Sequence, residues 1–183
     1  MKVPSQAKRV FKGIIFDVYQ WEQELFDGSK QTFEMLKRPD TVEVIAVKDG
    51  SILMSRQSQP NKHDFFSLFG GRVEPDEEPL AAAQRELKEE SGLSSNDWEL
   101  FKVYEPIGKI EWSIYIYIAR NCEKVAEQQL DSGEKISIIP YSFDEFFDTL
   151  ISDKTWEPEL ALDLLKMQRS PRSIASFKKR LFT

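Results

Sequence analysis

The sequence predicts a mixed α/β fold, because three of its features indicate strands packed against helices. The N-terminal half holds several short runs of β-branched and aromatic residues bounded by turn residues. A central segment carries a helix start and a helix stop, and two more helical segments follow the last strands. Bounded apolar runs are typical of strands, and apolar residues three or four apart are typical of helices. Strands with one helix between them and two after them indicate an α/β sandwich.

The N-terminal segment is expected to form a small antiparallel β extension. Val10–Tyr19 and Thr32–Leu36 are rich in β-branched and aromatic residues and flank a glycine-containing turn. Arg38-Pro39-Asp40 then interrupts the pattern. We therefore divide the chain into an extension at residues 1–38 and a main domain at residues 39–183.

The main domain opens with a hairpin signal, in which Lys48-Asp49-Gly50-Ser51 separates Val42–Val47 from Ile52–Ser55. Further elements follow in order along the chain. We expect strands at Phe65–Phe69, Phe101–Tyr104, Ser113–Ala119 and Ile136–Ile139, and helices at Glu78–Ser91, Ser142–Leu150 and Pro158–Met167. The strand at Ser113–Ala119 alternates in polarity, which predicts one buried face. From Gln168 onward the chain is a basic tail whose structure the sequence leaves open, and at Lys178-Lys179-Arg180 we expect a frayed, solvated terminus.

Composition excludes several classes of protein. The 183 residues include 25 Lys and Arg against 31 Asp and Glu, a net charge of −6, which disfavours nonspecific binding to nucleic acid. The single cysteine, Cys122, excludes an internal disulfide, and the single histidine, His63, excludes a multi-histidine metal centre within one chain. We expect no membrane span, because no apolar run approaches about 20 residues. Met1–Gly13 lacks the apolar core of a signal peptide, so a cytoplasmic location is expected.

The segment Gly70–Leu93 carries the chemistry, since its seven acids and three bases give a local net charge of −4. On a helix, Glu86, Glu89 and Glu90 share an arc of about 100°, while Leu80, Ala83 and Leu87 can face the core. A cluster of hard oxygen ligands is what Mg²⁺ or Mn²⁺ prefers. The alternative is a solvated acidic face on a surface helix, and the pattern alone favours neither.

The order of residues decides between them. Gly71 is followed after five residues by Glu77 and, after seven more, by Arg85-Glu86-Leu87-Lys88-Glu89-Glu90-Ser91-Gly92-Leu93. This resembles the Nudix box at all nine of its fixed positions, over 23 contiguous residues. The chain is therefore identified as a member of the Nudix hydrolase superfamily. The resemblance implies an α/β/α sandwich with a mixed sheet and hydrolysis of a diphosphate linked to another group, with the help of divalent cations.

Roles for individual residues also follow from the resemblance. Glu86, Glu90 and the carbonyl of Gly70 match the metal ligands, and Glu89 matches a carboxylate that supports further metal ions or the attacking water. Arg85 and Glu77 match a pair that orients the carboxylates, while Gly71 and Gly92 match turn positions. Physics supports the metal independently, because a diphosphate is repelled by an acidic patch unless cations reverse its sign.

A narrower resemblance points to the ADP-ribose and nucleoside-diphosphate-sugar pyrophosphatases. Arg38-Pro39 after an N-terminal β extension, and Arg56-Gln57 leading towards the box, resemble that branch, whose members dimerise through the N-terminal strands. The resemblance implies a homodimer and a catalytic Glu134 in an acidic loop, with Glu127, Glu111 and Asp131 as substitutes. Candidate substrate contacts are Arg56, Arg72 and Trp112.

The chain departs from this branch just before the box. There the branch has Glu-apolar-Pro-Ala-Gly, whereas this chain reads Phe65-Phe66-Ser67-Leu68-Phe69-Gly70-Gly71. The metal chemistry survives this change, but the base and sugar specificity does not follow from the branch. Three functions therefore remain open: hydrolysis of ADP-ribose or a nucleotide sugar, hydrolysis of a nucleoside triphosphate or damaged nucleotide, and a non-catalytic nucleotide-binding module. In each case the partner is a small nucleotide.

Overall fold

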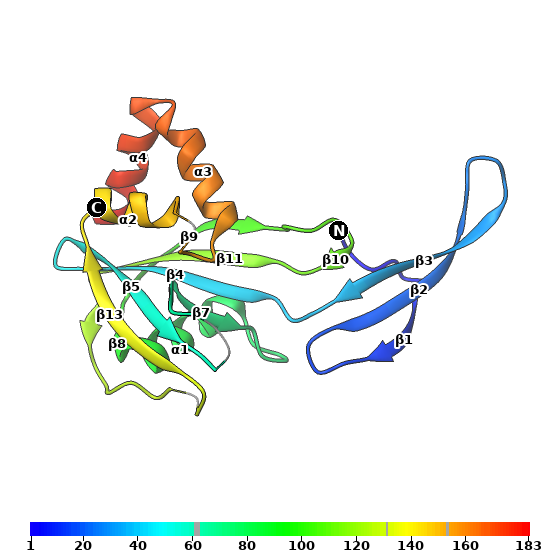
Figure 1. Ribbon diagram of the computed structural model, residues 1–183, viewed down its shortest axis with the longest axis horizontal. Coiled ribbons are helices and arrows are strands. Elements are labelled where there is room, and N and C mark those ends of the chain that lie inside the picture. The colour runs from blue at the N-terminus through cyan, green and yellow to red at the C-terminus, as the bar shows by residue number, and fades with distance from the viewer. Residues whose placement is uncertain (61–62, 131, 153) are drawn as a thin grey trace.

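The computed structural model describes residues 1–60, 63–130, 132–152 and 154–183. Within these ranges the chain forms a large mixed sheet with a layer of helix on each face. A narrow β arm projects from one end of this body (Figure 1). In the described ranges no helix is both long and apolar enough to cross a membrane.

The central sheet has seven strands. Its main path runs in the order β13-β5-β4-β11-β9, with β6 paired to β5 and β7 paired to β4. β4 and β11 are parallel, whereas the other pairs are antiparallel, so the sheet is mixed. The strands are β4 (Thr41–Lys48), β5 (Ser51–Ser58), β6 (Phe65–Ser67), β7 (Phe69–Arg72), β9 (Asp97–Tyr104), β11 (Ile114–Arg120) and β13 (Lys135–Tyr141).

Helices cover both faces of this sheet, which confirms the predicted α/β/α sandwich. The helices are α1 (Pro79–Ser91), α2 (Phe143–Leu150), α3 (Pro158–Gln168) and α4 (Pro171–Phe182). Alternate residues of β4 separate the two layers: Val44 packs with the α1 residue Leu87, and Ile45 packs with the layer formed by α2, α3 and α4. A two-stranded sheet of β8 (Leu93–Ser94) and β12 (Glu123–Lys124) lies beside the end of α1.

The N-terminal arm is a separate four-stranded sheet in the order β1-β2-β3-β10. Its strands are β1 (Lys8–Lys12), β2 (Asp17–Glu24), β3 (Lys30–Lys37) and β10 (Ile110–Glu111). β1, β2 and β3 are antiparallel, as predicted, while β10 comes from the main domain and pairs in parallel with β3. This pairing joins the arm to the body.

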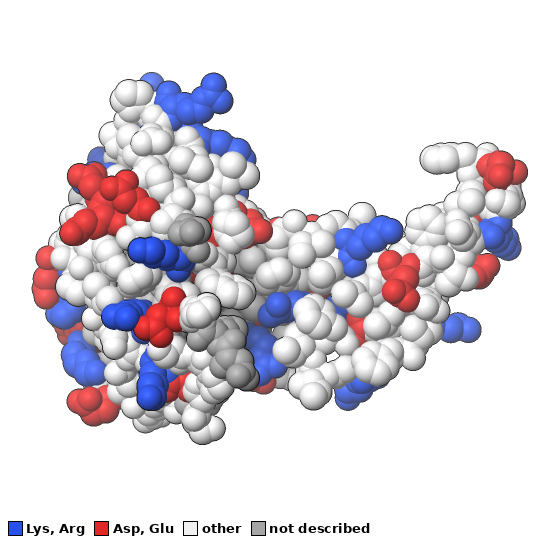
Figure 2. All heavy atoms as spheres, viewed as in Figure 1, with Lys and Arg blue, Asp and Glu red and all other residues white. Residues whose placement is uncertain are grey.

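Three local predictions were wrong, each because tertiary packing decides the outcome. The basic terminus forms α4, whose Phe177 and Leu181 are buried in the core, while Lys and Arg side chains lie at the outer end of the helical layer, at the top of Figure 2. β11 is buried on both faces, since helices cover both sides of the sheet at its centre. Leu80 is exposed, because the buried face of α1 runs through Ala82, Ala83 and Leu87 instead.

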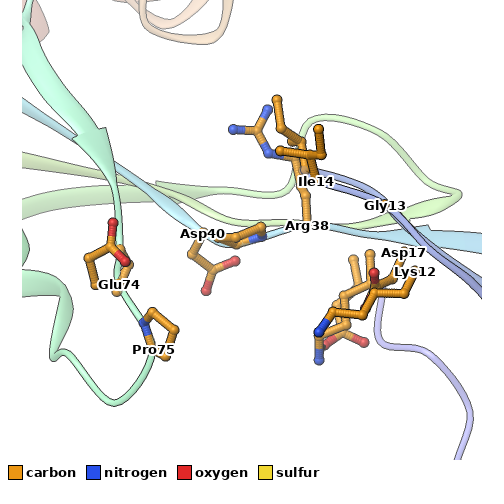
Figure 3. Close-up of a pocket in the computed structure, with 13 residues that line it drawn as sticks. Lys12, Gly13, Ile14, Asp17, Arg38, Asp40, Glu74 and Pro75 are labelled. Atoms are coloured by element: carbon orange, nitrogen blue, oxygen red, sulfur yellow. Dashed lines mark hydrogen bonds and ion pairs between the residues drawn. The ribbon is translucent and has the colours of Figure 1, made fainter. Parts of the chain in front are cut away.

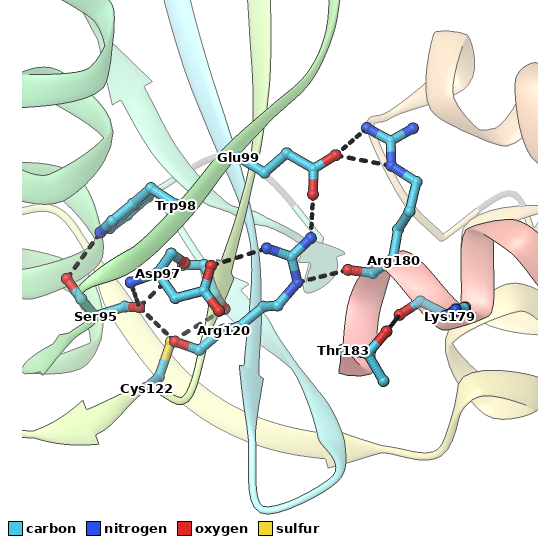
Figure 4. A network of polar contacts seen from close by, with 10 residues as sticks. Ser95, Asp97, Trp98, Glu99, Arg120, Cys122, Lys179, Arg180 and Thr183 are labelled. Atoms are coloured by element: carbon cyan, nitrogen blue, oxygen red, sulfur yellow. Dashed lines mark hydrogen bonds and ion pairs between the residues drawn. The ribbon is translucent and has the colours of Figure 1, made fainter.

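A buried arginine fastens α4 to the sheet (Figure 4). Arg120 on β11 donates through Nε to the backbone oxygen of Arg180 at 2.6 Å and pairs with Asp97 at 3.0 Å and with Glu99. Arg180 donates in turn to Glu99 at 2.8 Å and lies over the ring of Phe101. The last carbonyls of a helix lack partners within the helix, so Arg120 satisfies one of them with a positive charge.

Replacing this arginine should loosen the C-terminal helix. We expect Arg120→Ala to lower the free energy of unfolding by about 2 kcal/mol, because it removes a buried cation and leaves the Arg180 carbonyl and two half-exposed acids without their donor. Urea denaturation at pH 7 measures the change. Arg172→Ala, at an exposed position of α4, is the control, and an equal loss in both variants would contradict the proposed fastening.

Candidate active site

Three segments meet at an acidic hollow of about 320 Å³. They are the end of β7, one face of α1 and the stretch that precedes β13. The side chains that line the hollow include Glu86, Glu89, Glu90, Glu134, Arg72 and Arg85. The structure thus gathers most of the sequence-predicted site residues in one place.

Local signals in the sequence explain why α1 presents its carboxylates there. Pro79 stands in the first turn, where a missing N–H costs nothing, and Gly92 ends the helix in the left-handed conformation with φ of 69°. The Gly92 N–H donates to the carbonyl of Lys88 at 2.8 Å. The predicted helix bounds are therefore confirmed, and with them the shared face of Glu86 and Glu90.

Glu90 is the most deeply buried of these acids, with 7% of its surface exposed. Its Oε2 accepts a hydrogen bond from the backbone N–H of Gly70 at 2.8 Å. Burial raises the pKa of Glu90 to about 8, against the lowering effect of the Gly70 N–H, and the charges of Glu86, Glu134 and Glu89 add to the rise. Burial also raises the pKa of Glu86, although Arg85 opposes it.

Arg85 connects the acids of the site. Its guanidinium donates to both carboxylate oxygens of Glu77, at 2.9 and 3.0 Å, and also to Glu86 at 2.8 Å and Glu89 at 3.1 Å. A fifth bond, of 3.0 Å, goes to the backbone oxygen of Arg72 on β7. A planar fork of donors suits this task, because it fixes several carboxylates relative to one another.

The donor set fits a hard divalent cation, since carboxylate and carbonyl oxygens are the ligands that Mg²⁺ and Mn²⁺ prefer. Such a cation would offset the burial of the Glu90 charge and its repulsion by neighbouring acids. Over the described ranges, no group of three or more His, Cys, Asp or Glu side chains is arranged to hold a metal ion as it stands. In the structure Arg85 donates to Glu86 and Glu89, and the Gly70 N–H donates to Glu90.

A glycine at position 71 leaves room for the side chains of this acidic cluster. A Cβ at this position would overlap the carboxylate of Glu86, with Oε2 at 2.8 Å. At Gly70 the obstacle is instead the backbone of β4, where the carbonyl of Val42 is in the way. One glycine of the pair thus makes room for the Glu86 side chain and the other for strand pairing.

Other predicted site residues lie elsewhere. Arg56, exposed on β5, pairs with Asp64 at 2.8 Å, and Trp112 donates to Thr41 at 3.1 Å; neither is among the described residues that line the acidic hollow. The substitute base Glu127 has a side chain that is 98% exposed, and Glu111 pairs with Lys37 at the arm. Asp131 lies outside the described residues.

Sequence reasoning missed a second hollow, of about 520 Å³, between the arm and the body (Figure 3). It shares Glu74 with the acidic hollow. Arg38 lies at its edge, 4.4 Å above the ring of Trp112, and its Nε is buried with no hydrogen-bond partner in the part of the chain that the structure describes. Side chains around the hollow include Lys12, Asp17, Arg38, Asp40, Glu74 and Pro75. The signal near this hollow in the sequence is the Arg38-Pro39 pair, which belongs to the resemblance to the pyrophosphatase branch.

The raised pKa of Glu90 predicts a pH-dependent stability in the metal-free protein. Because a folded-state pKa of about 8 lies above the ordinary value of 4.5, the stability that this group contributes is present below pH 4.5 and lost as the pH rises towards 8. Glu90→Gln removes this loss. The free energy of unfolding of the variant, relative to that of the parent protein, should therefore rise between about pH 5 and pH 8 by on the order of 3 kcal/mol. Thermal unfolding in a chelator measures it, and a constant difference would contradict it.

Comparison with known proteins identifies the class to which this fold and site belong. The sequence profile of the NUDIX domain matches residues 37–163, and the chain is a member of the Nudix family. It is a hydrolase that resembles ADP-ribose pyrophosphatase. The match spans the central sheet and both sides of the acidic hollow.

Two relatives cover most of the chain, and a third matches one third of it. The ADP-ribose pyrophosphatase of Bacillus subtilis (strain 168) is 26% identical over 167 residues, 88% of this chain and 89% of that protein. The methanol dehydrogenase activator of Bacillus methanolicus is 23% identical, covering 90% and 92%. The CTP pyrophosphohydrolase of Escherichia coli (strain K12) is 38% identical over 61 residues, 33% of this chain and 45% of that one.

A solved structure confirms the fold. The crystal structure of an ADP compounds hydrolase superposes with a TM-score of 0.73 at 19% identity, covering 93% of this chain and 95% of the other. The arm and the body are therefore both included in the shared architecture.

Proposed function

We propose that this Nudix hydrolase cleaves the diphosphate of a nucleoside diphosphate joined to a second group, with ADP-ribose or a nucleotide sugar as substrate and Mg²⁺ or Mn²⁺ as cofactor. One observation carries the proposal: Glu86, Glu89, Glu90 and Glu134 line one hollow, in which Glu90 is buried. The four acids repel one another and would also repel a diphosphate. Bound cations would offset both repulsions and allow the diphosphate to bind.

The residues of the chain divide the work. Glu86, Glu90 and the Gly70 carbonyl would hold the cation, which supplies charge neutralisation of the phosphates and a lower pKa for the attacking water. Glu134 would accept a proton from that water, with Glu89 as the neighbouring carboxylate. The water oxygen joins one phosphorus, the bridging P–O bond breaks, and two monophosphates leave. Arg85 and Glu77 hold the carboxylates in place.

The second hollow suits the part of the substrate beyond the diphosphate. Its volume lies in the range typical of ligand pockets, and it adjoins the acidic hollow at Glu74. Arg38, stacked on Trp112, presents a planar cation there, and Ile15 adds apolar surface. Arg72, which lines the acidic hollow, is the candidate contact to phosphate. This division would give the arm a role in specificity.

We also propose that the protein is a cytoplasmic homodimer that associates through the arm. Apolar side chains at the β1–β2 turn are uncovered: Phe11 is 60% exposed and Ile14 is 98% exposed. Patches of this kind mark interaction sites. Cys122 is a buried free thiol, which suits a reducing compartment. Light scattering should give a mass of about twice 21.3 kDa, and a monomer at micromolar concentration would contradict the dimer.

Hydrolysis of a nucleoside triphosphate remains the second candidate. The similarity to a CTP pyrophosphohydrolase over 61 residues favours it, as does the altered segment before the box. The products separate the two functions: a nucleoside diphosphate sugar yields two monophosphates, whereas a triphosphate yields a monophosphate and pyrophosphate. A non-catalytic nucleotide-binding module would give tight binding without turnover.

A hydrolysis screen with product identification tests the proposal. The panel holds ADP-ribose, nucleotide sugars, dinucleotides, and ordinary and oxidised nucleoside triphosphates, each with Mg²⁺, with Mn²⁺ and with a chelator. We expect metal-dependent formation of AMP and ribose phosphate from ADP-ribose, or the corresponding monophosphates from a nucleotide sugar. Preference for triphosphates would overturn the substrate class, and binding without turnover would overturn the catalytic function.

A further inference from the structure

The C-terminal end of α1 is capped by a distant part of the chain. The final carbonyls of a helix have no partners within the helix. Here the Glu89 carbonyl accepts from the Gln129 N–H at 2.8 Å, and the Glu90 carbonyl accepts from the side-chain amide of Gln128 at 2.5 Å. The ammonium of Lys124 donates to the Ser91 carbonyl at 3.3 Å. The segment at residues 124–129 thus donates hydrogen bonds to three consecutive carbonyls of the helix that carries the acids.

Gly92 shows how closely this segment approaches the helix. Its carbonyl accepts from the N–H groups of Val125 at 2.9 Å and Ala126 at 3.1 Å. A Cβ at Gly92 would overlap the carbonyl of Ala126, and the φ of 69° disfavours any side chain as well. The segment therefore lies directly on the helix end, and its position depends on this glycine.

Gln128 makes a second bond that reaches across to the central sheet. The same amide nitrogen donates to the carbonyl of Ile136 on β13 at 3.3 Å. Ile136 follows Glu134 by two residues, and Glu134 lines the acidic hollow opposite the acids of α1. One side chain therefore joins the helix that bears Glu90 to the strand that follows Glu134.

We propose that Gln128 is a positioning residue, whose amide holds the Glu134 segment and the end of α1 in register so that four carboxylates face one hollow. Like charges in a shared hollow repel, so the segment that carries Glu134 needs a restraint. Gln128 itself is half-buried and is not among the described residues that line the hollow. It acts through the two carbonyls that it joins. The effect on turnover rests on the proposed hydrolase function, whereas the structural effect does not.

Two variants test this role. Gln128→Ala removes the amide, and Gln128→Glu keeps the shape but offers no donor to either carbonyl. Glu123→Ala, at an exposed position of β12 that precedes the segment, is the matched control. Hydrogen exchange at the Gln129 amide reports the bond to Glu89, and steady-state kinetics on the substrate found in the screen reports the catalytic geometry.

We expect both Gln128 variants to exchange the Gln129 amide at least about fivefold faster, because each loses the two bonds of the Gln128 amide and a single hydrogen bond corresponds to about a fivefold change. We also expect kcat to fall about tenfold while KM stays within about twofold, because small displacements of catalytic groups affect the reacting step. Unchanged exchange, a change in KM alone, or an equal kcat loss in Glu123→Ala would overturn the proposal. Unfolding of both variants would also overturn it, in favour of a purely structural role. If the parent hydrolyses nothing in the panel, the proposed function fails while exchange still decides the positioning.

Discussion

Glu90→Gln should lower kcat for hydrolysis by roughly 10³-fold while leaving the fold intact. The glutamine Oε1 can still accept the hydrogen bond that Glu90 now receives from Gly70 at 2.8 Å, so the end of β7 keeps its contact with α1. What is lost is a charged oxygen ligand in the hollow. Replacement of groups that merely support a metal ligand costs about 10–100-fold, and loss of a ligand should cost more, roughly 10³-fold in kcat. Glu86→Gln should behave similarly.

Two measurements check the cause of this loss. Calorimetric titration with Mn²⁺ should show weakened binding in Glu90→Gln, and circular dichroism should show an unchanged spectrum. Glu123→Gln, an exposed acid on β12, is the charge-matched control and should keep full activity. Turnover at the level of the parent protein in Glu90→Gln would exclude the proposed cation chemistry.

The part of the site that the sequence could predict is the part held by short-range geometry. Pro79 and Gly92 mark the bounds of α1, and the helical period then places Glu86 and Glu90 on one face. The hairpin of β4 and β5 followed from its Asp-Gly turn for the same reason. Such signals act within a few residues, so a single sequence carries them in full.

The remainder depends on contacts between distant residues. Ser170 and Pro171 mark the start of α4 locally, but its docking on the sheet depends on the burial of Phe177 and on Arg120, which lies 60 residues away and binds the backbone oxygen of Arg180. Likewise, Gln128 is one glutamine among several in the sequence, and its role becomes visible only when its amide meets the carbonyls of Glu90 and Ile136. The candidates Arg56 and Trp112 were chosen from local context, which does not fix the direction in which a strand-borne side chain points.

Gly71→Ala should separate function from stability more cleanly than any change of an acid. The Cβ would overlap the Glu86 carboxylate, which is the end of a flexible side chain and can rotate away at little cost to the fold. We expect the free energy of unfolding to change by less than about 1 kcal/mol. Hydrolysis should fall about 100-fold, because the displaced carboxylate leaves the position in which Arg85 holds it.

Two further glycines provide the comparison. Gly108→Ala, with nothing within 4 Å of the added Cβ, should change neither stability nor activity. Gly70→Ala would overlap the carbonyl of Val42 in β4, so it should destabilise the fold itself. If Gly71→Ala loses as much stability as Gly70→Ala, the Glu86 carboxylate cannot rotate away. If it keeps full activity, the position of that carboxylate is not what the reaction requires.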